Sequence, residues 1–456
     1  MTESLTPALK QALSNDLLES LTGPIATGTL RTLHGSTAFP GKATVVIGMR
    51  RAGKTTLLHQ LRQERMIRGQ RRNQLPYINF EDERLLGLQA ADLGFLLEEY
   101  GRQVPPPLDG GRVTWSFDEI QAIPGWEKFV RRLLDSGSAE VLITGSSAAL
   151  LSREIGTSLR GRAWTVPLFP FSFPESLTHA GKTLPEPGQL ALSKVRAQVE
   201  HDFRTWLEVG GFPEAQRAPS ATRGQLLQDY VDVAMLRDVV ERHGVTNLAG
   251  LRWLLRLLLG NAGGLFSVEK FHAALKSQGI AIGRDTVHEL LGYLEDCFLV
   301  RTVWMEANSE RQRMVNPRKA YPADQGLIPW FDRSGRANLG HALETAVLIE
   351  LERRRCQVTY VRTASGGEVD FLASNPAGER VLIQVCADAS AKETAARELR
   401  ALEEAGRTYP DAGRLLLTLT RDGSPSSETP GVTVRPAYDW MLEQPAGEYQ
   451  PFRLDG

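Results

Sequence analysis

Short runs of consecutive apolar residues alternate with helical segments in the first part of the chain. The runs are ATVVI, LPYINF, RVTWSF, AEVLIT and AWTVPLF. Strands that are apolar without interruption are typical of a parallel sheet that is covered by helices on both faces. We therefore predict an α/β domain over residues 25–180, built on a parallel sheet of five strands, after an N-terminal helix over residues 1–24.

The pattern becomes helical after a segment rich in proline and glycine, AGKTLPEPGQL. It predicts a helical block, or lid, over residues 190–262. Residues 263–330 then show the pattern of a helix, a turn, a second helix and a strand, which predicts a winged-helix domain. The apolar positions of the second helix recur at i, i+3, i+4 and i+7: Val287, Leu290, Leu291 and Leu294.

The last part of the chain, residues 335–456, again mixes helices and strands. A helix (GHALETAVLIELERRR) precedes three strands (CQVTYVRT, EVDFLAS and RVLIQVC). A second helix (AKETAARELRALEEAG) and a further strand (GRLLLTLT) follow. This order predicts a small α/β domain.

The composition is that of a globular protein, with 456 residues, 42% hydrophobic and 23% charged residues, and a net charge of −1. This charge excludes a polycation that coats nucleic acid, so any contact with nucleic acid must come from local basic patches. The three cysteines have no paired spacing, which argues against disulfides or a zinc site. Reduced cysteines are typical of the cytoplasm, so we expect a cytoplasmic location. Runs of about 18 apolar residues are absent from the sequence, so we expect no membrane partner.

A phosphate-binding loop is predicted at GMRRAGKT, between an apolar strand and a helix. Gly48 and Gly53 allow the backbone N–H groups to face phosphate oxygens, and the start of the helix adds positive charge. Lys54 is expected to contact the β- and γ-phosphates of ATP, and the Thr55 hydroxyl to ligate Mg²⁺. The other residues of this predicted nucleotide site are Arg51, Ala52 and Thr56.

Two acids follow the third apolar strand, in VTWSFDEI. We expect Asp118 to hold Mg²⁺ through water and Glu119 to polarise the attacking water. The fourth strand ends in Thr144 and Ser146, where a polar side chain can sense the γ-phosphate. An ordinary helix cap is the alternative for this serine.

Two arginines in SLRGRAW, Arg160 and Arg162, are candidates for a contact with the nucleotide of a neighbouring subunit. Such an arginine would stabilise the charge of the phosphoryl group in the transition state. This hypothesis favours Arg162 and predicts a homo-oligomer, a ring or a dimer. The alternative is a solvated surface arginine.

A candidate metal site lies in the tail, where EVDFLASNPAGERVLIQVC has the spacing of a metal-dependent nuclease hairpin. Asp370 on the first strand and Glu344 on the preceding helix are possible Mg²⁺ ligands. Gln384 and Cys386 stand where such a hairpin has an acid and a lysine, and they supply neither a carboxylate nor a positive charge. We therefore favour a vestigial site that contacts DNA or protein over an active nuclease.

DNA contacts are expected near the winged helix. The polar face of its second helix carries Asp285, His288 and Glu289, which are poor partners for phosphate, so the basic segment RQRMVNPRK is the better candidate. A solvated charged face is the alternative. The candidate DNA contacts are Arg284, Arg311, Arg313, Arg318 and Lys319.

The chain resembles the AAA-like P-loop ATPases that carry a C-terminal domain of unknown function, the AAA_14/DUF4143 group. The resemblance rests on GMRRAGKTTLL, YINFED, ITGSSAALLSREIGTSLRGR, LFPFSFPE, GGFPE and NPRKAYPADQGL, and it extends to the tail. It covers nearly the whole chain in the order of the family. It implies an AAA+-type, Mg²⁺-dependent ATPase core, a winged-helix region and a tail similar to the PD-(D/E)XK nuclease (restriction-endonuclease-like) fold.

These observations together predict an ATPase that uses ATP and Mg²⁺ and acts on DNA, branched or single-stranded, as an oligomer. A signalling or defence ATPase that gates a protein partner without contacting DNA is one alternative. A nuclease regulated by ATP is the other.

Overall fold

The computed structural model describes residues 5–104, 111–145, 159–186, 188–332, 338–426 and 429–443. The chain divides into two compact units. The first unit contains Met1–Arg31 and Ser36–Leu168, and the second contains Thr32–Gly35 and Phe169–Gly456. The segment that follows Leu168, which we expected to close the first domain at residue 180, therefore belongs to the second unit.

The first unit alternates strands and helices, as the apolar runs predict. Its elements are α1 (Pro7–Thr22), β1 (Ala43–Ile47), α2 (Lys54–Ile67), β2 (Tyr77–Asn79), α3 (Gly94–Gln103), β3 (Val113–Asp118), α4 (Glu127–Asp135), β4 (Ala139–Gly145), β5 (Ala163–Pro167) and the 3₁₀ turns Arg72–Gln74, Glu83–Leu85, Ala90–Leu93 and Ile120–Ala122.

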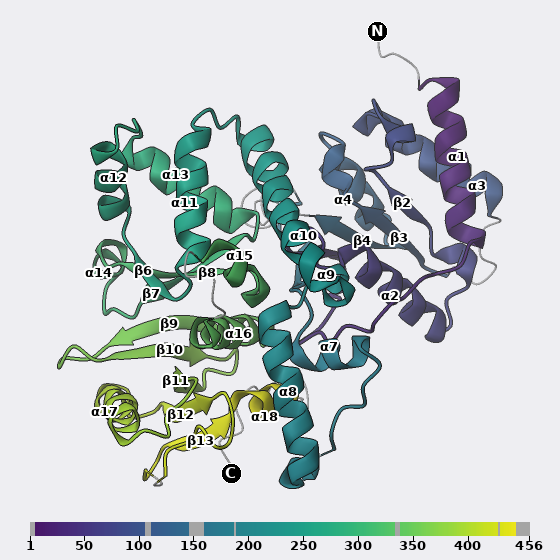
Figure 1. The fold of residues 1–456 in the computed structure, drawn as a ribbon. Helices are drawn as coiled ribbons and strands as arrows, with labels where there is room; N and C mark the ends of the chain where they lie inside the picture. The colour runs from purple at the N-terminus through teal and green to yellow at the C-terminus, as the bar shows by residue number, and fades with distance from the viewer. Residues whose placement is uncertain are drawn as a thin grey trace. The chain divides into compact units, whose positions relative to one another are not determined.

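A parallel sheet of five strands forms the centre of the first unit, in the order β2–β3–β4–β1–β5 (Figure 1). Every neighbouring pair of strands is parallel. All of β1 and most of β3 and β4 are buried, as expected for strands of a parallel sheet that is covered on both faces. The predicted parallel α/β core is confirmed.

The N-terminal helix α1 is packed into the first unit. Thr6 caps it by accepting a hydrogen bond from the Leu9 N–H at 3.3 Å. Leu13 and Leu17 are fully buried, and α1 contacts α3 and β2. The helix is therefore part of the first unit and does not stand apart from it.

The second unit contains the remaining elements. They are α7 (Phe173–His179), α8 (Ser193–Val209), α9 (Pro213–Arg217), α10 (Ser220–Val233), a π-helical segment (Ala234–Glu241), α11 (Leu248–Gly260), β6 (Gly264–Phe266), α12 (Val268–Ser277), α13 (Arg284–Asp296), β7 (Val300–Met305), α14 (Glu310–Val315), β8 (Arg318–Pro322), α15 (Ile328–Phe331), α16 (Leu339–Arg353), β9 (Gln357–Arg362), β10 (Glu368–Ser374), β11 (Arg380–Cys386), α17 (Lys392–Thr408), β12 (Gly413–Thr418), β13 (Thr433–Pro436), α18 (Ala437–Leu442) and the 3₁₀ turns Gln189–Ala191 and Gln325–Leu327.

One sheet of eight strands runs through the second unit, in the order β13–β12–β11–β10–β9–β7–β8–β6. Strands β6, β8 and β7 are antiparallel and accompany α12 and α13, which is the arrangement of a winged helix. Strand β7 also pairs in parallel with β9, through Met305 and Tyr360 among others. This pairing satisfies backbone groups that a free strand edge would expose. The segments that we predicted as separate winged-helix and tail domains therefore share one sheet.

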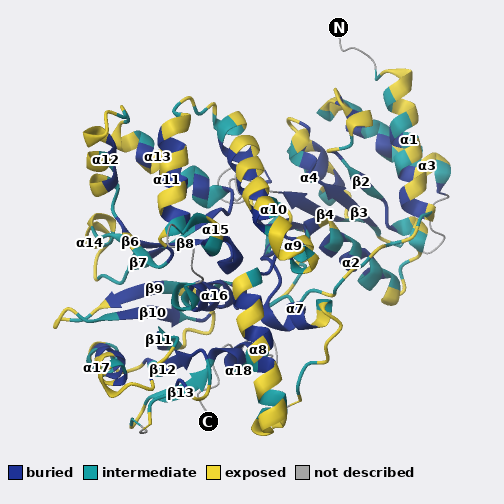
Figure 2. Cartoon of the chain, in the orientation of Figure 1, coloured by how far each residue is buried: buried dark blue, intermediate teal, exposed yellow. Residues whose placement is uncertain are grey.

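The helical block is likewise built into the second unit. Helix α8 packs against α7 and α16, and α11 packs against α13 and β8. The outer sides of α8, α11 and α13 are exposed, whereas α7, α16 and strand β8 are mostly buried (Figure 2).

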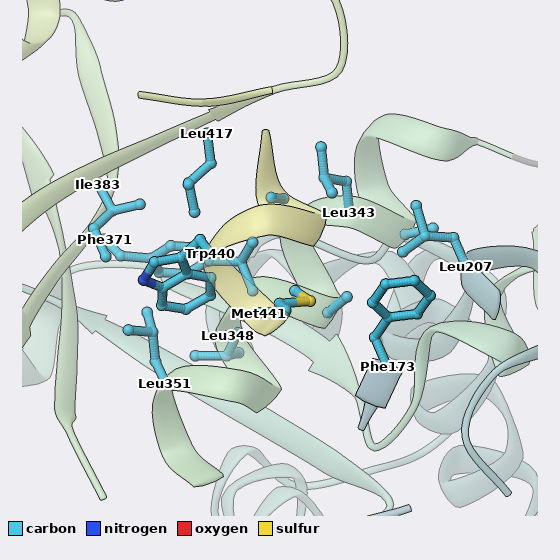
Figure 3. Close-up of a cluster of buried hydrophobic side chains, with 14 of the residues drawn as sticks. Phe173, Leu207, Leu343, Leu348, Leu351, Phe371, Ile383, Leu417, Trp440 and Met441 are labelled. Atoms are coloured by element: carbon cyan, nitrogen blue, oxygen red, sulfur yellow. The ribbon is translucent and has the colours of Figure 1, made fainter. Parts of the chain in front are cut away.

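Helices cover both faces of the tail part of this sheet. On one face, Phe371, Ile383 and Leu417 pack with α16 and α18 (Figure 3). On the other face, Leu372, Leu382 and Leu416 pack with α17. This alternation follows the period of two along each strand. It also separates Val385, on the α16 side, from Cys386, on the α17 side.

Within the described part of the chain, each helix is too short or too polar to cross a lipid bilayer. The three cysteines are free thiols, two of them buried and one partly exposed: Cys297, Cys356 and Cys386.

Candidate nucleotide site and the carboxylate cluster of the tail

The phosphate-binding loop joins β1 to α2 and depends on its glycines. A Cβ atom at Gly48 would lie 2.0 Å from the Leu168 carbonyl oxygen, so the loop requires glycine there. Gly53 precedes the helix with a φ of 97°, in the left-handed region that favours glycine. The backbone of the loop is thus set by these two positions.

Helix α2 begins at Lys54, and no side chain of the described residues caps it. Its first N–H groups are therefore available for an anion. Lys54 is 6% exposed, and its Nζ donates to the carbonyl oxygens of Gly48 and Met49 at 3.3 Å each. The same Nζ lies 3.6 Å from Glu119 Oε1, so the lysine and the second acid meet at one place.

The other predicted residues of the loop have different surroundings. Thr55 and Arg51 are exposed and Thr56 is partly exposed. Ala52 is fully buried, and its backbone N–H donates to the Met49 carbonyl oxygen at 3.3 Å within the loop.

Asp118 is held by side chains from the two strands next to β3. Tyr77 on β2 donates its hydroxyl to Asp118 Oδ2 at 2.8 Å. Thr144 on β4 donates to Asp118 Oδ1 and accepts from the Glu119 N–H at 2.9 Å. Each carboxylate oxygen retains a further lone pair, as a water-bridged Mg²⁺ ion requires.

The position of Thr144 changes its predicted role. A threonine hydroxyl has one proton, and Thr144 gives it to Asp118. In this arrangement it cannot also donate to a γ-phosphate, so it positions the two acids. Ser146, the other predicted sensor, lies outside the described residues.

Glu119 lies in a buried and polar environment. Burial raises the pKa of its carboxyl group, and the Lys54 charge opposes that rise. Gln121, two residues later, donates its side-chain amide to Glu119 Oε2. Sequence reasoning missed Tyr77 and Gln121, because neither residue belongs to a motif that marks a contact with an acid.

The two candidate arginines differ in their contacts. Arg162 forms an ion pair with Asp135 of the same unit, so its guanidinium is engaged within its own chain. Arg160 is exposed and has a φ of 51°, which is uncommon for a residue other than glycine. Arg160 is therefore the more accessible of the two arginines, since Arg162 is partly buried and paired within its own unit.

Replacing Thr144 by valine keeps the shape of the side chain but removes its hydroxyl. We expect kcat for ATP hydrolysis to fall about 10- to 100-fold with little change in KM, because Asp118 and the Glu119 N–H each lose a buried partner. Steady-state kinetics would measure this change. Thr144→Ser retains the hydroxyl and should remain close to wild type. An unchanged kcat in Thr144→Val would show that the bridge does not position the acids.

In the tail, the predicted acids surround a lysine. Lys319 on β8 is 2% exposed, and its Nζ lies 2.8 Å from Asp370 Oδ1 and 3.0 Å from Glu344 Oε1. Glu368 Oε1 is a third contact at 2.8 Å. We call Lys319, Glu344, Glu368 and Asp370 the carboxylate cluster.

Charge and burial together set the protonation of this cluster. Burial alone lowers the pKa of Lys319, but the nearby carboxylates raise it above its ordinary value. Burial and the Asp370 charge raise the pKa of Glu344 to about 7, although Lys319 opposes them. Tyr321 also donates to Glu344 Oε1 at 2.7 Å.

Gln384 and Cys386 form hydrogen bonds with groups other than the lysine. Gln384 Oε1 accepts from the Asp370 N–H at 3.3 Å, and its Nε2 donates to Glu398 Oε2 at 2.7 Å. The Cys386 thiol donates to the Asp388 carbonyl oxygen at 3.3 Å, and burial raises its pKa. Both side chains are thus engaged locally and neither makes a contact with Lys319 among the described residues.

The residues that we predict to contact DNA lie in different surroundings. Lys319 is buried in the carboxylate cluster, so the prediction that it contacts DNA is corrected. Arg318 lies over the Trp304 ring, with its guanidinium carbon 3.5 Å from the ring centroid. Arg284 and Arg313 pair with Glu269 and Glu310 respectively, at 3.2 and 3.5 Å, and Arg311 is exposed.

The parallel sheet, the glycine loop and the two acids at the end of β3 define the first unit as an AAA-type P-loop fold. The sequence matches the AAA domain family over residues 40–177, a domain of unknown function (DUF8612) over residues 200–337, and DUF4143 over residues 339–438. The chain belongs to the family of AAA-like P-loop ATPases with a C-terminal DUF4143 domain, as predicted.

Two relatives match this chain over most of their length. An uncharacterized protein of Methanocaldococcus jannaschii is 33% identical over 374 residues, which cover 80% of this chain and 79% of the relative. An uncharacterized protein of Haemophilus influenzae is 30% identical over 342 residues, or 75% and 81% of the two chains.

Solved structures are similar at a lower level. The Walker-type ATPase of Pyrococcus abyssi gives a TM-score of 0.39 at 16% identity, covering 71% of this chain and 95% of that chain. The ORC2 protein of Aeropyrum pernix gives a TM-score of 0.35 at 14% identity, covering 73% and 95%.

Proposed function

We propose that the first unit binds ATP with Mg²⁺ and hydrolyses it. The observation that supports this proposal is the meeting of Lys54, Asp118 and Glu119 beside the uncapped start of α2. Ligands of open α/β sheets bind at the carboxyl ends of the strands, which is where these residues lie. The glycine loop, the carboxylate and the hydroxyl of Thr55 fit a phosphate chain with its magnesium ion.

In this proposal each residue of the site has its own role in ATP hydrolysis. The magnesium ion, when bound, neutralises charge on the phosphate oxygens. Lys54 and the N–H groups of α2 bind the phosphates and stabilise the charge that develops on them. Glu119 accepts a proton from the attacking water, and its raised pKa makes it a better base than a free carboxylate. Tyr77 and Thr144 keep Asp118 oriented toward the metal position.

We further propose that turnover is coupled to the binding or remodelling of DNA. The support is the winged-helix arrangement of β6, α12, α13, β7 and β8, with Arg311 exposed between β7 and β8. This part of the proposal is separate from ATP hydrolysis and needs its own test.

The ATPase rate should rise severalfold when single-stranded or forked DNA is added at moderate salt. Arg311→Glu should weaken this response, because it reverses a charge near the wing, which is the hairpin formed by β7 and β8. Arg407→Glu, an equal change at an exposed site on α17, serves as the control. If no DNA structure raises the rate or binds below micromolar concentrations, the DNA role is abandoned and the ATPase assignment is unaffected.

We also propose that the active form is an oligomer in which Arg160 reaches the nucleotide of a neighbour. Arg160→Ala and Lys54→Ala should each be inactive alone, since one lacks the arginine and the other lacks the phosphate-binding lysine. A mixture of the two should regain ATPase activity at sites that combine an intact Lys54 with a neighbour's Arg160. Arg162→Ala is the matched control and should retain activity. A mixture that stays inactive, with both variants folded, contradicts an arginine supplied in trans.

A second candidate function is an ATPase switch that gates a protein partner. It is supported by a groove of about 780 Å³ between α10, α11 and α15. Trp253, Leu257 and Trp330 line the groove and are 41%, 43% and 36% exposed. Exposed apolar side chains that gather in one patch mark interaction surfaces, whereas single scattered ones do not. This function gains support if DNA leaves the ATPase rate unchanged.

A further inference from the structure

The carboxylate cluster already contains a cation. Its three carboxylates come from α16 and β10, and its ammonium group comes from β8 of the wing. The side chains of Lys319, Asp370 and Glu344 are 3%, 10% and 14% exposed. The buried ammonium group of Lys319 therefore lies at the centre of three acids.

A nuclease-like tail implies a divalent metal, but the residues do not fit one while Lys319 is in place. The carboxylate oxygens lie 2.8–3.0 Å from Lys319 Nζ. Metal–oxygen distances are shorter, about 2.0–2.1 Å for Mg²⁺ and about 2.3–2.6 Å for Ca²⁺. Within the part of the chain that the structure describes, no group of three or more acids, histidines or cysteines is arranged to hold a metal ion.

The wing contributes a second group to the cluster in addition to the ammonium of Lys319. Tyr321 follows Lys319 by two residues on β8, so both side chains leave the same face of the strand. Its hydroxyl donates to Glu344 Oε1, the oxygen that Lys319 also contacts. On the tail side, Asp370 Oδ2 accepts from the Val385 N–H at 3.0 Å, which fixes the acid against β11. The cluster therefore joins β8, α16, β10 and β11.

We propose that Lys319 is an internal cation that takes the place of a metal and locks the wing to the tail. While the ammonium is present, the tail binds no divalent cation at these acids. Removal of the ammonium leaves three carboxylates around its former position. A relaxation of about 0.5 Å would bring them to calcium distances, and a somewhat larger one to the distances of smaller divalent ions. This inference does not depend on the proposed ATPase or DNA function.

The test compares divalent cation binding by the full-length protein before and after Lys319 is replaced by methionine, a chain of similar length without charge. Binding of Mn²⁺ is measured without nucleotide, from the loss of the electron paramagnetic resonance signal of free Mn²⁺. Lys319→Met should bind one more Mn²⁺ per chain than the wild type, and Ca²⁺ should raise its melting temperature by several degrees. Lys319→Met/Asp370→Asn should lose the additional ion.

A second variant covers the case in which Lys319→Met does not fold, because three carboxylates that have lost their shared cation, two of them largely buried, repel one another. Lys319→Met/Glu368→Gln removes one negative charge and should still bind the additional Mn²⁺ through Glu344 and Asp370. A folded variant of either kind that binds no more Mn²⁺ than the wild type overturns the proposal.

The wild-type protein provides an independent test. Its Mn²⁺ binding should be the same with and without Asp370→Asn, and it should show no Mg²⁺- or Mn²⁺-dependent cleavage of plasmid or forked DNA. Metal-dependent cleavage that disappears in Asp370→Ala would overturn the proposal and establish the tail as a nuclease.

Discussion

Lys54→Ala and Glu119→Gln are each expected to reduce ATP turnover by at least about 10²- to 10³-fold, the scale of losing a preorganised charge at a transition state. Lys54 is buried beside the loop and next to Glu119, so alanine removes the positive charge from this position. Glutamine keeps the size of Glu119 but cannot accept the proton of the attacking water. The measurement is phosphate release under steady-state conditions.

Binding distinguishes the two variants from each other. Glu119→Gln should bind ATP with an affinity close to that of wild type, because the glycine loop and Lys54 remain intact. Lys54→Ala should bind ATP more weakly, because it loses a charge that contacts the phosphates. Titration with a fluorescent ATP analogue measures both. Normal hydrolysis by Glu119→Gln would show that the base has been assigned to the wrong residue.

Trp440→Ala is expected to lower the free energy of unfolding of the second unit by about 3–5 kcal/mol, the usual cost of truncating a large buried aromatic side chain. Trp440 on α18 is 1% exposed and packs in the cluster that includes Phe371, Leu348 and Leu351 (Figure 3). The Arg354 guanidinium also lies 4.2 Å from the centroid of its ring. Truncation removes these contacts and leaves a cavity between α16 and the sheet.

Trp440→Phe is the control for this prediction. It keeps an aromatic ring and removes an indole N–H that is buried without a hydrogen-bond acceptor among the described residues. Its loss of stability should therefore be clearly smaller than that of alanine. Denaturant titration of both variants gives the comparison. Equal stability of Trp440→Ala and wild type would contradict the role of α18 as a core element.

The phosphate-binding loop could be located from the sequence because its parts are neighbours in the chain. Gly48, Gly53 and Lys54 act through one turn of backbone, so their spacing alone indicates what they do. The acids after β3 were located in the same way, because a strand that ends in Asp118 and Glu119 carries them to the same edge of the sheet. The partners of Asp118 could not be located, since Tyr77 and Thr144 reach it only through the order of the strands.

The tail shows the limit of this reasoning more clearly. In the sequence, Gln384 and Cys386 stand in place of an acid and a lysine, so the hairpin itself lacks a positive charge. The structure supplies that charge from Lys319, which is 51 residues away from Asp370 along the chain. The sequence predicts a surface contact with DNA for the same lysine, because its neighbours in the sequence are basic.

The sequence by itself determined the parallel α/β core, the position of the phosphate-binding loop and the membership of the family. These properties depend on the periodicity of burial along each element and on contacts within one turn. The joining of the wing to the tail in one sheet, the partners of Asp118 and the burial of Lys319 were decided only by the tertiary structure. Each of them depends on which distant segments pair or pack together, and the free energy of a charged side chain is set by those neighbours and not by the residues beside it in the chain.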